Sequence, residues 1–174
     1  LVQGQVMEAM AIYKDAFKNN TPLDRDGKTA LINTAVSTPS LFSNLSEADK
    51  KEVMSYLISL EKDNVSNNPS DSLMELQLSQ IYSLALNNTT DKKLAEEYYN
   101  EALKAIDISI AVSPQRVPVY VMKSNILASA KNYDKAVETA TTAIEFNQTL
   151  PDAYCQIYRV YTLKEADLIK NKAK

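Results

Sequence analysis

The side chains that most often carry enzyme chemistry are scarce in this chain. It has no histidine and a single cysteine, Cys155. A lone cysteine cannot form an intramolecular disulfide or a CxxC metal site, and without histidine the Ser-His-Asp triad, the Cys-His pair and most zinc sites are excluded. We therefore expect Cys155 to be a buried structural thiol rather than a nucleophile.

The carboxylates offer two further kinds of chemistry, calcium binding and acid–base catalysis. Asp24-Arg25-Asp26-Gly27 resembles the start of a calcium loop, but the alternating oxygens and the closing glutamate do not follow, so we expect a helix-capping turn. Paired carboxylates act in glycosidases, but the candidates in this chain fall at expected helix starts or exposed positions: Asp91, Glu96, Glu97, Glu138 and Asp152. The sequence predicts a protein that is not an enzyme and that holds no metal or cofactor.

Composition narrows the fold class and the kind of partner. The chain has 174 residues, of which 45% are hydrophobic and 24% charged, and its formal net charge is −3. Two glycines are too few for the turns of an all-β protein or for a glycine-rich phosphate loop. The slight acidic excess, without a basic face, predicts no nucleic-acid binding.

Apolar residues recur at helical spacing along most of the chain. Val6, Met10, Tyr13 and Phe17 form one such stripe, and Ser46 begins another helix as its N-cap. A connector at residues 39–44 carries Leu41 and Phe42, which we expect to fill a gap in the core. Further helices are expected at 26–36, 71–86, 91–112, 117–130, 133–147 and 151–170.

A 34-residue period is the most informative pattern. Tyr120 and Tyr154 are 34 positions apart, and Ala136, Ala140 and Ala143 place small side chains on one face of the helix between them. With Tyr133 before that helix and Ser124 where a glycine is usual, this pattern resembles the tetratricopeptide repeat (TPR). The residues near Ser113-Pro114 and Pro151 are also similar, loosely, to the TPR tails of bacterial O-antigen ligase and polymerase-like membrane proteins.

The TPR resemblance implies an all-α, right-handed α-solenoid of antiparallel helical hairpins, with about eight helices. We expect degenerate repeats in residues 1–70 and TPR-like repeats in residues 71–174. The second part would comprise an extended repeat at 71–116, a repeat at 117–150 and a terminal helix at 151–174.

The resemblance also implies a non-catalytic scaffold for protein–protein interaction. The first helices of such hairpins line a concave face, where Gln80, Asn125 and Arg159 would form one row for a protein or peptide partner. The carboxylate-clamp variant of the family also has an asparagine at the place of Asn125, but it needs a lysine one turn earlier, where Val121 stands. A chaperone-tail receptor is therefore not expected.

Two other functions remain open. End-to-end stacking of copies would give a self-assembling filament, with contacts at Val6, Met10, Tyr158 and Tyr161. Alternatively, the chain is the extracytoplasmic accessory domain of a membrane polysaccharide ligase or polymerase. It opens with Leu1 rather than methionine, and we expect any membrane contact to come from a segment outside it.

Six Asn-x-Ser/Thr sequons give a hint about the compartment. All six fall where we expect loops between helices, which makes them candidate glycosylation sites and favours an extracytoplasmic or cell-surface protein. They are Asn19, Asn44, Asn64, Asn87, Asn88 and Asn147.

Overall fold

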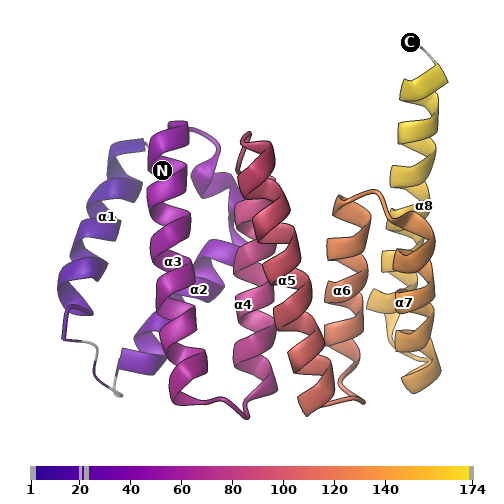
Figure 1. The fold of residues 1–174 in the computed structure, drawn as a ribbon, viewed down its shortest axis with the longest axis horizontal. Coiled ribbons are helices and arrows are strands. Elements are labelled where there is room, and N and C mark those ends of the chain that lie inside the picture. The colour runs from indigo at the N-terminus through magenta and orange to yellow at the C-terminus, as the bar shows by residue number, and fades with distance from the viewer. Residues whose placement is uncertain (1–2, 20, 22–23, 173–174) are drawn as a thin grey trace. The chain divides into compact units, whose positions relative to one another are not determined.

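The fold consists of helices throughout the part of the chain that the computed structural model describes, residues 3–19, 21 and 24–172 (Figure 1). The elements follow in this order: α1 (Gln3–Ala16), α2 (Arg25–Ser37), the short 3₁₀ helix η2 (Pro39–Phe42), α3 (Glu47–Asn67), α4 (Ser72–Asn87), α5 (Lys92–Val112), α6 (Val117–Ser129), α7 (Tyr133–Phe146) and α8 (Pro151–Lys172). The six helices whose bounds the sequence predicts differ from these bounds by two residues or fewer.

Short polar residues set several of these helix starts. The Ser46 hydroxyl accepts the backbone N–H of Asp49, and the carboxylates of Asp71 and Asp91 accept backbone N–H groups from the first turns of α4 and α5. Asp24 precedes α2, but its carboxylate instead accepts the backbone N–H of Thr21, which closes a turn. Unpaired N–H groups at helix starts explain why Ser and Asp recur at these positions.

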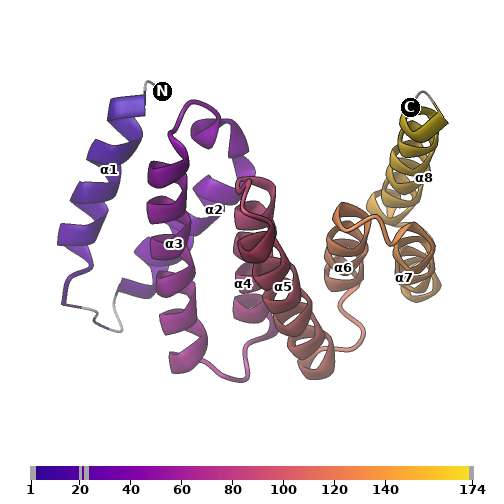
Figure 2. The same ribbon diagram turned by 45° about the horizontal axis from the view of Figure 1, so that its top comes forward.

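The chain divides into two compact units, residues 1–105 and 106–174, and the boundary falls inside α5. In unit 1, α2, α3 and α4 pack together around buried Ile32, Leu57 and Ile81, while α1 lies at the outer edge of the unit in both views (Figures 1 and 2). Phe42 is buried, as predicted, whereas Leu41 beside it is half-buried.

Unit 2 contains the last part of α5 together with α6, α7 and α8. Helix α7 packs against both α6 and α8, and the C-terminal half of α8 extends beyond the α6–α7 hairpin (Figure 1). Its core combines Val119, Ile126 and Val160 with four fully buried alanines. The predicted division at residue 70 concerns repeats rather than compact units, and it stays a prediction.

Candidate protein-binding surface

Small side chains hold the α6–α7 hairpin together. Ala136, Ala140 and Ala143 form the buried face of α7, and the hydroxyl of buried Ser124 on α6 donates a 2.7 Å hydrogen bond to the Ala136 carbonyl oxygen. A hydroxyl that reaches a helix carbonyl needs the two backbones close together, which only small residues permit. At one end of the hairpin, Tyr120 packs on Phe146 with 5.3 Å between the ring centroids.

The turn between α6 and α7 is closed by two backbone hydrogen bonds. Asn132 N–H donates to the Leu127 carbonyl and Lys131 N–H to the Ala128 carbonyl, which is the Schellman arrangement. Lys131 has a φ of 63° there, in the left-handed region that usually holds glycine.

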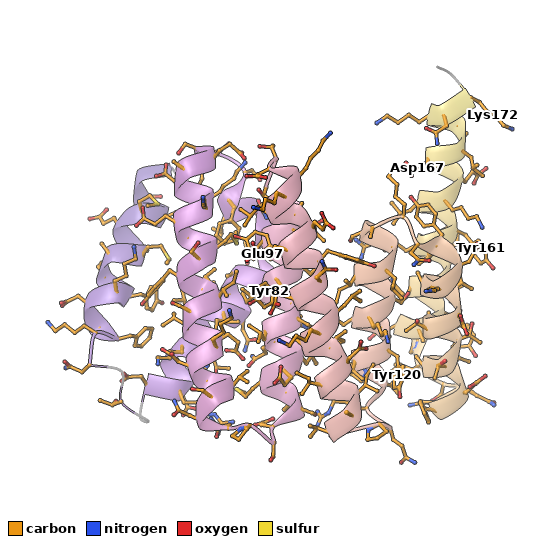
Figure 3. The ribbon with its side chains drawn as sticks, viewed as in Figure 1. Tyr82, Glu97, Tyr120, Tyr161, Asp167 and Lys172 are labelled. Carbon is orange, nitrogen blue, oxygen red and sulfur yellow. The ribbon has the colours of Figure 1, made fainter. Side chains whose placement is uncertain are left out.

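Helix α8 is attached to this turn through Asp167. The carboxylate oxygen Oδ2 of Asp167 accepts the Tyr133 hydroxyl at 2.8 Å and pairs with Lys131 Nζ at 2.6 Å. These two donors hold the pKa of Asp167 below its usual value, and burial together with the same hydrogen bond raises the pKa of Tyr133. Figure 3 shows Asp167 on a different side of α8 from Tyr161.

The side of α8 that carries Tyr161 is not covered by another element of unit 2. Tyr154, Tyr158 and Tyr161 are 49%, 76% and 55% exposed, and Leu168 and Ile169 farther along α8 are also exposed. We call these five residues the tyrosine face. Spacings of four, three, seven and one residues place its members on one side of the helix, and the exposed Glu165 lies on the same side between Tyr161 and Leu168.

A model of the tetratricopeptide repeat family matches residues 117–149, which are α6, α7 and the turns that flank them. Residues 117–149 are a tetratricopeptide repeat. The whole fold is similar to the crystal structure of a thermophilic TPR protein from Thermus thermophilus, with a TM-score of 0.65 and 19% identity over 91% of this chain and 74% of that one. The predicted fold class, an all-α TPR-like solenoid of hairpins, is confirmed.

One curated relative matches over a shorter stretch. The Hsp70-Hsp90 organising protein of Plasmodium falciparum (isolate 3D7) is 32% identical over 66 residues, which is 38% of this chain and 12% of the relative. This chain therefore spans about an eighth of the length of that protein. TPR proteins are in general non-catalytic modules for protein–protein interaction.

The repeat relates the tyrosine face of α8 to a covered face of α6. A shift of 34 residues places Tyr154 at Tyr120, Tyr158 at Ser124 and Tyr161 at Leu127. On α6 these positions face α7: Tyr120 contacts Phe146, Ser124 bonds to Ala136, and Leu127 is buried. The tyrosine face thus repeats the side of a TPR first helix that its own second helix covers.

The residues predicted for a concave row lie in both units. Gln80 lies half-buried on α4 of unit 1. Asn125 and Arg159 belong to unit 2, where the Asn125 side-chain oxygen accepts the amide of buried Gln156 at 3.4 Å. Arg159 is exposed, and no described residue pairs with its guanidinium. The row stays a prediction.

The residues predicted for end-to-end contacts differ in exposure. Tyr158 and Tyr161 are exposed, but Val6 and Met10 are only 8% and 5% exposed, because they point toward the core of unit 1. The two residues on α1 that were predicted for end-to-end contacts are therefore part of the interior, whereas Ile12 and Tyr13 are large apolar side chains of this helix that are exposed.

Two further sequence expectations are wrong. Asn64 lies inside α3 rather than in a loop, is 3% exposed, and donates its amide to Glu61 at 2.9 Å. Cys155 is exposed rather than buried, because α8 turns its neighbours Ala153 and Gln156 toward the hairpin.

The other five sequons differ in their surroundings. Asn19, Asn44 and Asn147 lie in exposed turns or loops, whereas Asn87 ends α4 and Asn88 follows it half-buried.

The sequence did not reveal Asp167 as the residue that anchors α8. The signal was present, since Asp167 stands 34 positions after Tyr133, one repeat length along the chain.

Among the described residues no group of three or more His, Cys, Asp or Glu side chains could hold a metal ion, and no described helix is long and apolar enough to cross a membrane.

Proposed function

We propose that this protein is a non-catalytic interaction scaffold whose tyrosine face binds a helix of a protein partner. The observation that carries this proposal is the exposure of Tyr154, Tyr158 and Tyr161 in one stripe. A cluster of exposed apolar side chains of this kind is typical of protein-interaction sites, and tyrosine is enriched there because its ring is apolar and its hydroxyl stays hydrated.

The 34-residue shift that aligns α8 with α6 supports a helix as the occupant of this face. The equivalent side of α6 is covered by α7, so the surface has the spacing that receives a helix. Tyr158 stands where Ser124 allows close approach, so the occupant would lie farther from α8 than α7 lies from α6. Such an occupant needs side chains larger than the alanines of α7.

A second copy of this chain satisfies that requirement. In an antiparallel pair of α8 helices centred near Leu163, Tyr158 of one copy would lie opposite Leu168 of the other, and Tyr154 opposite Lys172. Tyrosine and leucine fill the wider space, and a lysine over a tyrosine ring adds a cation–π contact. Because such a pair is two-fold, it closes on itself as a dimer.

The test is light scattering coupled to size-exclusion chromatography over a wide concentration series. We expect a dimer whose dissociation constant rises at least tenfold in Tyr158→Glu and is unchanged in Thr141→Glu, a matched substitution on the exposed side of α7. A monomer at every concentration would contradict self-association, and equal weakening by both variants would contradict the tyrosine face.

The same experiment addresses the filament. End-to-end stacking predicts a mass that keeps growing with concentration, because a heterologous contact does not close. Val6 and Met10, the contacts predicted for this alternative on α1, are buried, although Ile12 and Tyr13 of the same helix are exposed. We therefore expect the mass to stop at twice that of the monomer.

A polar peptide is a second class of occupant, on the row that includes Asn125 and Arg159. The exposed cation of Arg159 favours a carboxylate group, and a guanidinium can bind it with two hydrogen bonds. NMR titration with a tetra-aspartate peptide should shift the resonances of α6 and α8, and Arg159→Ala should abolish the shifts. Equal shifts with a tetra-lysine peptide would contradict this site.

An extracytoplasmic location also remains a proposal, as does the role of accessory domain for a membrane polysaccharide enzyme. The exposed sequons at Asn19, Asn44 and Asn147 support the location. Intact mass of protein from its native source should show glycan at one or more of these three positions and none at buried Asn64.

A further inference from the structure

Unit 1 contains an apolar cavity where α1, η2, α2 and α3 meet. Its volume is about 210 Å³, and its lining includes Met10, Leu31, Ala35, Phe42, Val53 and Leu57. Tyr13 and Leu41, both partly exposed, also line it, so the cavity reaches the surface between α1 and η2.

The cavity offers almost nothing polar to a bound molecule. None of the described residues that line it is charged. The Thr34 hydroxyl is occupied, because it donates to the Ala30 carbonyl oxygen at 2.9 Å. An ordered water needs two to four polar partners, so water is poorly held in such a space.

Contacts beside the cavity hold α1 in place. Lys14 Nζ pairs with Glu52 of α3 at 2.6 Å and lies 5.5 Å from the centre of the Tyr56 ring. Beyond the helix end, the Phe17 ring lies against Gly27 of α2, where an added Cβ would be 3.0 Å from it. These contacts position α1, but their side chains do not fill the cavity that lies beneath the middle turns of this helix.

We propose that this cavity is a binding site for a small uncharged apolar molecule, an aromatic or branched hydrocarbon group somewhat larger than benzene. Size supports this class, because an apolar cavity of about 150 Å³ engineered in another protein stays dry and binds benzene. The absence of charged residues from the described lining supports an uncharged ligand too, because burial of an ion without a partner is strongly unfavourable. The inference concerns unit 1 alone and does not depend on the tyrosine face.

The test uses toluene and benzylammonium as probes of the full chain. Toluene in excess should raise the Tm by several degrees, since a ligand that binds only the folded state stabilises it, and should shift the methyl resonances of Met10, Leu31 and Leu57. Benzylammonium, which has a similar shape and a charge, should bind at least tenfold more weakly. Absence of toluene shifts at these methyl groups would overturn the proposal.

A filled cavity provides the specificity control. Ala35→Leu places a larger side chain in the cavity and should abolish the effect of toluene, whereas Ala30→Leu, the same change on the exposed side of α2, should preserve it. Ala9→Leu narrows the opening of the cavity from α1, where Ala9 is exposed, and gives a second comparison if Ala35→Leu fails to fold. A toluene response that survives in a folded filled variant would contradict the site.

Discussion

The Tyr133 hydroxyl donates a 2.8 Å hydrogen bond to Asp167 Oδ2, and the two residues stand one repeat length apart in the chain. Tyr133 begins α7 and Asp167 lies in the C-terminal half of α8, so this contact joins the TPR hairpin to the helix that carries the tyrosine face. Lys131 shares the same carboxylate oxygen. The contact explains how α8 keeps its orientation beyond the end of the hairpin.

Asp167→Asn should remove a pH-dependent part of the stability of unit 2. The pKa of Asp167 is lowered from 3.8 in the folded state, chiefly by the hydrogen bond from Lys131. Its contribution is therefore complete above pH 3.8 and is lost as the pH falls through the lower folded value. Urea midpoints should differ between wild type and variant at pH 7, and the difference should shrink toward pH 3. A difference that does not depend on pH would contradict the charge-based contact.

Glu61→Gln should stabilise unit 1 at alkaline pH. Glu61 is fully buried, no described residue bonds to its Oε1, and burial raises its pKa from 4.5 to about 7 although Asn64 donates to the other oxygen. The carboxyl is neutral in both states below pH 4.5, so its stabilising effect is complete there and is lost as the pH rises through 7.

The size of that effect follows from the pKa difference, which corresponds to roughly 3 kcal/mol when the group is fully ionised. Urea unfolding of wild type should therefore weaken between pH 5 and pH 9, while Glu61→Gln should keep its midpoint. Glu97→Gln, at an exposed position of α5, is the matched control. A wild-type midpoint that is constant across this range would contradict the buried acid.

Lys131 carries a backbone cost that glycine would remove. Its φ of 63° is unfavourable for residues with a Cβ by about 1 kcal/mol. Lys131→Ala and Lys131→Gly both lose the ion pair to Asp167, so their difference isolates the backbone effect. We expect Lys131→Gly to be about 1 kcal/mol more stable than Lys131→Ala in chemical unfolding. Equal stability would indicate that the turn relaxes out of this conformation.

Ala140→Leu should test the close packing of α6 on α7. Ala140 is fully buried, and overpacking of this kind costs about 1–3 kcal/mol. Ala166→Leu, on the exposed surface of α8, makes the same change without overpacking and should stay close to wild type. Calorimetry of the two variants should show a lower Tm for the first alone, and a wild-type Tm in Ala140→Leu would show that the helices can separate to admit leucine.

The sequence by itself determined where the helices lie and how they repeat. Prolines, asparagines and capping residues act on their immediate neighbours, so Ser46, Asp71 and Pro151 mark helix starts without reference to the rest of the fold. The 34-residue spacing of Tyr120 and Tyr154 depends only on chain position, and the TPR at residues 117–149 follows from it.

Only the tertiary structure decided which side of each helix is covered. An apolar stripe on α1 is buried at Val6 and Met10, whereas the tyrosine face of α8 is exposed, although both patterns are similar along the chain. Asn64 is buried and Cys155 is exposed for the same reason. Burial depends on which elements pack against a face, and residues distant in sequence supply those elements.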